Sequence, residues 1–202
     1  MTAKKTKRAN EKIEIILDAS KRVLARYGYA KTTIAKVAEE AGVSRGLLHY
    51  HFKNKEEMLA RVLRANMEEG DKIVTDIINN CTSVEMVAKK LVETFKKIVQ
   101  TDPDYFYLFL EGLGALRHSE TVRNELMNLY DSFRNSLKIS LSQLEKKGVI
   151  SPAIHPDGLA SLITGILDGM GIALTTMSGL KDNEENWHSV ERGFIALMAP
   201  KK

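Results

Sequence analysis

Cysteine, proline and aromatic residues are scarce in this chain of 202 residues. The single cysteine, Cys81, excludes an intrachain disulfide, and we expect its thiol to be a small buried hydrophobic group. Only four prolines and 6% aromatic residues occur, among many alanines, leucines, glutamates, lysines and methionines. Such a composition favours helices, so we predict an all-α fold with about nine helices and no strand.

The chain also lacks the short motifs of common catalytic sites. It contains no glycine-rich phosphate loop, CxxC pair or nucleophile elbow. His49 and His51 are two residues apart on a predicted helix. Their side chains therefore point about 200° apart and cannot share one metal ion. His118 lies seven residues after Glu111, roughly 10 Å along a helix axis. This separation is too long for the two side chains to bind one metal ion without other ligands. We therefore predict no enzyme activity, no metal site and no cofactor.

Long hydrophobic runs are nearly absent. The most apolar stretch, residues 159–178, approaches membrane-spanning length, but Asp168 near its centre would be costly in a bilayer. We expect a buried helix that packs closely on another through Gly165 and Gly169, with no membrane partner. The N-terminus is basic and has no apolar core of a signal peptide, so we expect a cytoplasmic, nucleoid-associated protein.

Charge is distributed unevenly along the chain. Residues 1–64 hold 15 Lys+Arg and 7 Asp+Glu, whereas residues 65–202 hold 15 and 19. A basic head on a mildly acidic body is expected where one end contacts phosphates. Residues 1–9 are expected to be disordered in isolation, either as a solvated tail or as a basic arm that follows DNA.

The stretch 32–55 reads as two short helices around a tight turn. The first ends near Ala41, and Gly42 follows where a helix end needs a left-handed residue. Ser44 is a suitable N-cap for a second helix over about 45–52. This pattern is typical of a DNA-binding helix-turn-helix. Donors for base edges and phosphates lie on or just after the second helix: Arg45, His49, Tyr50, His51 and Lys55.

Helical periodicity and end signals predict the remaining helices. We expect capping boxes of Thr82 with Glu85 and of Asp182 with Glu185, and an N-cap at Ser119. A continuous helix over 55–78 would join head and body without a flexible linker. The other helices are expected over about 10–27, 83–100, 105–116, 119–147, 159–178 and 183–198.

A long run of motif residues extends over residues 10–64: Tyr27-Gly28, Thr32-Thr33, Ala38, Ala41-Gly42-Val43-Ser44, Gly46, Leu48, Tyr50, His51-Phe52 and Lys53-Asn54-Lys55. In this run the sequence resembles the TetR family of bacterial transcriptional regulators. Beyond it, only helix number and length are similar. Asp168-Gly169, with Gly148 and Pro152, resembles the C-terminal domain of the BetI-like subgroup.

The resemblance implies a DNA-binding domain over 1–54, with the arm 1–9, and a ligand-binding and dimerisation domain over 55–202. The family more often has tyrosine at position 49 and threonine or alanine at position 47, so the operator sequence stays open. The implied DNA contacts are Thr33, Ser44, Arg45, Gly46, Leu47, His49, Tyr50, His51 and Lys55.

The resemblance also implies a homodimer that binds a palindromic operator in double-stranded DNA. Its two-fold interface would lie on the last two long helices, about 159–178 and 187–198. The recognition helices would then lie about 34 Å apart. Small residues expected at this interface are Ala160, Gly165, Gly169, Gly171 and Ala173.

A cavity for a small-molecule effector among the middle helices is implied as well. Apolar residues at helical spacing could equally be ordinary core. Glu111 or Asp168 could hold a cationic ligand, or could bond Arg117, a helix end or the second subunit. Overall we expect a mainly hydrophobic effector. Candidate residues are Phe95, Ile98, Tyr105, Phe106, Phe109, Leu110, Glu111, Leu113, His118, Met127, Tyr130, Phe133, Asp168 and Met170.

We therefore expect a dimeric repressor that its effector releases from the operator through a tilt of helix 55–78. Two alternatives stay open. One is an architectural or division-control DNA-binding protein of the same fold without an effector. The other is an enzyme or ligand carrier with an incidental helix-turn-helix. The identity of the effector, the regulated genes and the choice between repression and activation are not encoded in any motif.

Overall fold

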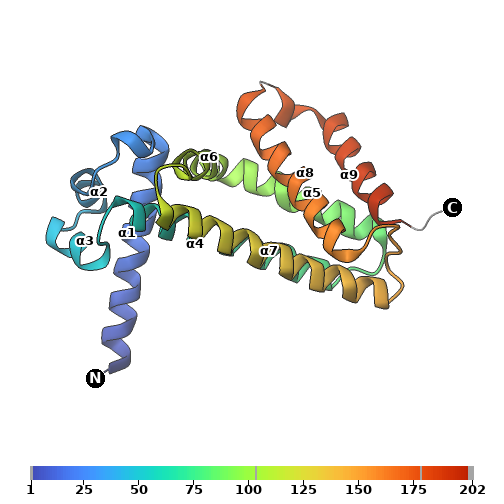
Figure 1. Ribbon diagram of the computed structural model, residues 1–202, viewed down its shortest axis with the longest axis horizontal. Coiled ribbons are helices and arrows are strands. Elements are labelled where there is room, and N and C mark those ends of the chain that lie inside the picture. The colour runs from blue at the N-terminus through green and yellow to red at the C-terminus, as the bar shows by residue number, and fades with distance from the viewer. Residues whose placement is uncertain (1, 103, 178, 200–202) are drawn as a thin grey trace. The chain divides into compact units, whose positions relative to one another are not determined.

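The computed structural model describes residues 2–102, 104–177 and 179–199, without the side chains of residues 2–10 and 69–79. This part of the chain is all-α, as predicted, with nine α-helices and one short 3₁₀-helix and no strand (Figure 1). The helices are α1 (Thr2–Lys31), α2 (Ile34–Ala41), α3 (Arg45–His51), α4 (Lys55–Asn79), α5 (Val84–Thr101), α6 (Tyr105–Ala115), α7 (Glu120–Lys146), α8 (Pro156–Thr176), η1 (Leu180–Asp182) and α9 (Glu184–Met198).

The chain forms two compact units. Unit 1 comprises Met1–Met67 and Tyr107–Asn128, and unit 2 comprises Glu68–Phe106 and Leu129–Lys202. Helices α4, α6 and α7 therefore each contribute residues to both units. The functional division into 1–54 and 55–202 stays a prediction.

In unit 1, α1, α2 and α3 pack around a small apolar core. Gly28 (φ 70°) interrupts α1, and Gly42 (φ 64°) ends α2 in the left-handed conformation, both as predicted. The backbone N–H of Val43 donates to Ala38 O at 3.0 Å, which closes the turn. The core residues are Ile16, Val23, Val37, Ala38, Leu48, Phe52 and Met58.

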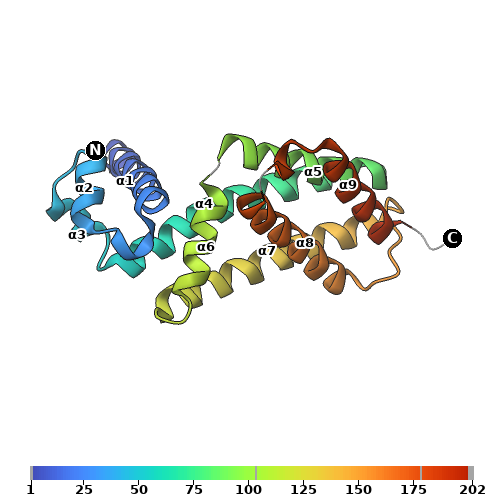
Figure 2. The same cartoon turned by 90° about the horizontal axis from the view of Figure 1, so that it is seen from above.

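Unit 2 has a larger core, in which α5 packs on α9 (Figure 2). Gly171 of α8 is buried against the ring of Phe106. A Cβ at this position would lie only 2.1 Å from a ring carbon, so the close packing requires glycine. Cys81 belongs to this core, as expected, and burial raises the pKa of its thiol. The rest of this core consists mainly of aliphatic residues from α5, α7, α8 and α9.

Three local predictions were wrong. Helix α1 begins at Thr2, so the basic segment is helical here instead of disordered. The N-cap of α5 is Ser83, in place of Thr82, because Ser83 has the extended backbone and accepts from Met86 N at 3.2 Å. The N-cap of α9 is Asn183, since Asp182 is held in the 3₁₀-helix and cannot adopt that geometry. Both N-caps were thus misplaced by one residue, and neither observed cap forms a capping box, because Met86 and Asn186 stand at the third helical position.

Helix α8 is also less covered than predicted. It is the one helix in the described part of the chain that is long and apolar enough to cross a membrane, by length and composition alone. Only 28% of its most apolar window is buried inside the chain. Leu162 (45% exposed) and Ile172 (39% exposed) face outward, together with Gly165 and Gly169. The expected buried helix therefore has an open apolar face.

Candidate functional site

Helix α3 presents a polar surface on a rigid base. Ser44 caps it by accepting a hydrogen bond from Leu47 N at 3.2 Å, and Leu48 and Phe52 anchor it in the core of unit 1. Arg45, His49 and Tyr50 are exposed on this helix, the last with 83% of its surface accessible. The Tyr50 hydroxyl can therefore reach a partner without any change in the helix.

The other predicted DNA contacts around α3 have mixed environments. Thr33 is exposed and caps α2, accepting from Lys36 N at 3.3 Å. Gly46 is exposed, and only Ser44 Oγ would lie within 4 Å of an added Cβ, so a partner can approach closely. Leu47 is half-buried against the core of unit 1, and His51 is half-buried with its ring beside that of Tyr50. Leu47 and His51 are therefore partly structural.

Lys55 has structural partners that the sequence did not reveal. Its Nζ donates to Tyr29 O at 3.0 Å and lies 4.2 Å from the centroid of the Tyr29 ring. The Tyr29 hydroxyl in turn donates to Glu56 at 2.9 Å, and burial together with this bond raises the pKa of Tyr29 to about 12. Lys55 therefore stabilises the end of α1, and this role is separate from the DNA contact that was predicted for it.

Some of the positive charge in the basic head is neutralised within the head. Arg22 and Arg26 of α1 both pair with Glu40 of α2, at 2.8 and 3.5 Å. The Arg22 guanidinium holds the pKa of the Glu40 carboxyl below its usual range. Lys36 Nζ donates to Lys31 O at 2.9 Å. These contacts cross between helices, so no local sequence signal could have found them.

Glu111 of α6 stabilises the interruption of α1. Its carboxylate accepts a hydrogen bond from Tyr29 N at 2.7 Å, directly after the positive-φ residue Gly28. A Cβ at position 28 would lie only 3.1 Å from Glu111 Oε1. Of the roles considered for Glu111, the bond to a helix end is therefore the one observed.

The candidate effector residues fall into two groups. Phe109, Leu110, Glu111, Leu113, His118 and Met127 belong to unit 1, and Phe95, Ile98, Tyr105, Phe106, Tyr130, Phe133, Asp168 and Met170 belong to unit 2. His118 is exposed and Met127 is 57% exposed, so neither can line a buried cavity. Met127 follows the buried Leu126 by about 100° around α7, which turns it outward.

In unit 2, four aromatic rings form a connected cluster. The ring centroids of Phe95 and Phe106 lie 5.3 Å apart, those of Tyr105 and Phe106 5.0 Å, and those of Phe95 and Trp187 6.2 Å. Trp187 was not among the predicted residues, because it lies on α9, where only dimer contacts were expected. Tyr130 donates its hydroxyl hydrogen to Asp168 at 2.8 Å, and both residues are half-buried.

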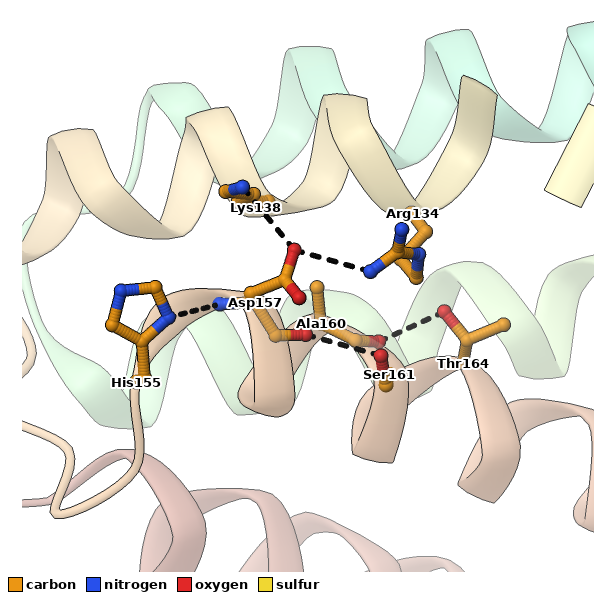
Figure 3. A network of polar contacts seen from close by, with 7 residues as sticks. All are labelled: Arg134, Lys138, His155, Asp157, Ala160, Ser161 and Thr164. Carbon is orange, nitrogen blue, oxygen red and sulfur yellow. Dashed lines mark hydrogen bonds and ion pairs between the residues drawn. The ribbon is translucent and has the colours of Figure 1, made fainter. Parts of the chain in front are cut away.

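A second polar cluster in unit 2 fixes the start of α8 (Figure 3). Asp157 binds Arg134 at 3.1 Å and Lys138 at 3.2 Å, both on α7. Lys138, followed by Arg134, holds the pKa of the Asp157 carboxyl below its usual range. His155 Nδ1 accepts from Asp157 N at 3.3 Å and so caps the helix. Within the described residues, no group of His, Cys, Asp and Glu is placed to hold a metal ion.

The small residues expected at a dimer interface are partly buried within unit 2 and partly exposed. Ala160 and Gly171 are buried inside unit 2 and cannot meet a second subunit, because α8 turns them toward its own core. Gly165 and Gly169 are exposed with nothing within 4 Å of an added Cβ, as is Gly193 on α9. Of the five small residues predicted at the interface, Gly165 and Gly169 are thus exposed on α8, and Ala173 is half-buried.

Known proteins resemble this chain in sequence and in fold. A family model described as "Bacterial regulatory proteins, tetR family" matches residues 16–62. The fatty acid metabolism regulator protein of Bacillus subtilis (strain 168) is 24% identical over 154 residues, which cover 76% of this chain and 78% of that protein. Salmonella enterica GusR has the same fold, with a TM-score of 0.79 at 18% identity over 93% of this chain and 95% of that one. A putative transcriptional regulator from Saccharomonospora viridis in complex with choline gives a TM-score of 0.77 at 22% identity, over 96% of this chain and 100% of that one.

Proposed function

We propose that this chain, which belongs to the TetR family of bacterial transcriptional regulators, is a dimeric repressor that a small effector releases from a palindromic operator. Proteins of this family bind DNA and are not enzymes. The observation that carries the proposal is the surface of α3, where Arg45, His49 and Tyr50 are exposed around a helix whose other side is anchored by Leu48. A helix of this kind can enter the major groove and place donors on base edges and phosphates.

Dimerisation is supported by the open face of α8. Leu162, Gly165, Gly169 and Ile172 are exposed at helical spacing, and Gly193 of α9 is equally open. A second copy of this chain would cover this apolar surface and bring two α3 helices onto one operator. We expect a dimer by light scattering. Gly165→Leu should produce monomer, whereas Gly114→Leu, an equally open glycine outside this surface, should not.

Effector control is supported by two features. Helix α4 contributes Lys55–Met67 to unit 1 and its remainder to unit 2, so a shift of this helix would reach both units. The Saccharomonospora viridis regulator, which has this fold, is known in complex with the small molecule choline. We propose that a ligand in unit 2 favours a conformation whose two heads no longer match the operator spacing.

The test begins with genome-wide identification of the bound operator, followed by affinity measurements on that sequence. Arg45→Ala should weaken binding by about 1–3 kcal/mol, or roughly fivefold to 150-fold. Lys147→Ala, an exposed charge in unit 2, is the matched control and should change little. Lys55→Ala is unsuitable here because it also removes the bond to Tyr29.

Binding should also weaken steeply with salt, because phosphate contacts release counterions. A flat dependence of affinity on salt, or unchanged affinity after Arg45→Ala, would contradict the proposal. If the operator binds but no metabolite screened by thermal shift stabilises the protein, the architectural alternative is favoured over effector-controlled repression.

A further inference from the structure

Asp168 lies in the middle of α8 and is half-buried in unit 2. Its carboxylate accepts one hydrogen bond, from the Tyr130 hydroxyl at 2.8 Å. Among the residues that the structure describes, no lysine, arginine or histidine pairs with it. Burial raises the pKa of this carboxyl, and the bond from Tyr130 offsets only part of that effect. A buried carboxylate without a cation costs free energy unless a ligand supplies the charge.

One aromatic side chain contacts this carboxylate and others pack on the same helix. Burial, followed by Asp168 and by Tyr105, raises the pKa of the Tyr130 phenol. The Tyr105 ring contacts Phe106, and Phe106 packs on Gly171, one helical turn after Asp168 on the same face of α8. A carboxylate beside tyrosine rings is the combination that recognises organic ammonium ions, through charge and cation–π attraction.

Two other carboxylates, one in each unit, already have partners. Asp157 of unit 2 has Arg134 and Lys138 as partners. Glu111 of unit 1 accepts a hydrogen bond from Tyr29 N. Of the two carboxylates that the sequence left open as holders of a cationic ligand, Glu111 has a backbone N–H as its partner and Asp168 has the Tyr130 hydroxyl. This difference favours Asp168.

We propose that Asp168 holds the positively charged group of a small organic ammonium effector, with Tyr130 and Tyr105 beside the cation. The inference rests on the proposed function, because it names the ligand class of the effector site. It also modifies the expectation of a mainly hydrophobic effector: the ligand has an apolar body and one cationic end.

The binding experiment uses the full-length protein without DNA. Choline and hexyltrimethylammonium are the probes, and 3,3-dimethylbutan-1-ol is the uncharged isostere of choline. Affinity is measured by calorimetry and by the fluorescence of Trp187, the single tryptophan, whose ring lies 6.2 Å from that of Phe95. We expect saturable binding of at least one cation, and binding of the isostere that is weaker by roughly tenfold or more.

Three variants localise the site. Asp168→Asn keeps an acceptor for Tyr130 and should weaken cation binding by roughly tenfold or more while the protein stays folded. Asp131→Asn, an exposed carboxylate on the same helix as Tyr130, and Glu111→Gln should bind as wild type does. Equal affinity of cation and isostere, no binding of either cation, or equal loss in Asp168→Asn and Asp131→Asn would overturn the proposal.

Operator binding, measured separately, distinguishes this inference from the proposed function. If the cation binds at Asp168 and operator affinity does not change, the ligand class is correct and effector-controlled repression is wrong. If the operator is bound and released by a different class of compound, with no cation bound by the free protein, repression holds and the inference fails.

Discussion

Gly171→Ala tests how α8 is seated in unit 2. A Cβ at this position would lie 2.1 and 2.2 Å from two ring carbons of Phe106, which is itself buried. The ring would have to move by more than about 1 Å to restore normal contact, and overpacking of this kind costs about 1–3 kcal/mol or more. Alanine gains roughly 1 kcal/mol of helix propensity over glycine, which offsets part of this loss. We therefore expect a net loss of up to about 2 kcal/mol, or up to about 8 °C in Tm for a chain of this size.

The assay is thermal unfolding by circular dichroism, with urea unfolding to give free energies. Gly114→Ala is the matched control, because this helical glycine has nothing within 4 Å of an added Cβ. It should leave Tm unchanged or raise it. Phe106→Leu should partly rescue Gly171→Ala, so that the double variant is more stable than the sum of the two single losses by about 1–2 kcal/mol. Additive losses, or equal effects of Gly171→Ala and Gly114→Ala, would refute this description of the packing.

Three further outcomes are expected. Glu111→Ala leaves Tyr29 N without its acceptor and should cost about 1–3 kcal/mol in urea unfolding, whereas Glu111→Gln should retain most of that stability. Because burial raises the pKa of Cys81, its thiol should react with a disulfide reagent at pH 8 far more slowly in the folded protein than in urea; equal rates would show that it is accessible. Because the pKa of Asp168 is raised on folding, its ionised form destabilises the protein at neutral pH. Asp168→Asn should therefore be at least as stable as wild type at pH 7.5, with a difference that shrinks as the pH falls toward about 4, and a variant that is less stable at pH 7.5 would contradict this.

The cap errors show how far local signals reach. Thr82 and Ser83, like Asp182 and Asn183, are adjacent residues that can both cap a helix. The residue that caps is the one whose backbone is extended, and neighbouring structure sets that backbone: Asp182 is unavailable because η1 includes it. Sequence patterns therefore identified the helices but not all of their first residues. The predicted start differs by one position for α5 and α9, by three for α8 and by eight for α1.

The candidate sites differ in the same way. The turn at Gly42, the cap at Ser44 and the exposed donors of α3 follow from residues close together in the chain, so they were predictable. Lys55 was predicted as a DNA contact from its position alone, and its bond to Tyr29 depends on the return of the chain after α3. Met127 and His118 were expected in a cavity because apolar or polar residues at helical spacing do not reveal which face of a helix is covered.

By itself, the sequence determined the all-α fold, the helix-turn-helix and the resemblance to TetR-family regulators, because propensity, capping and turn residues act over a few positions. Only the tertiary structure decided which carboxylates are satisfied. Glu111 meets a backbone N–H that the interruption at Gly28 exposes, and Asp157 meets two cations of α7. Asp168 meets only the Tyr130 hydroxyl among the described side chains. The physical reason is that burial and ion pairing depend on contacts between helices far apart in the chain, and these contacts give each carboxylate its role.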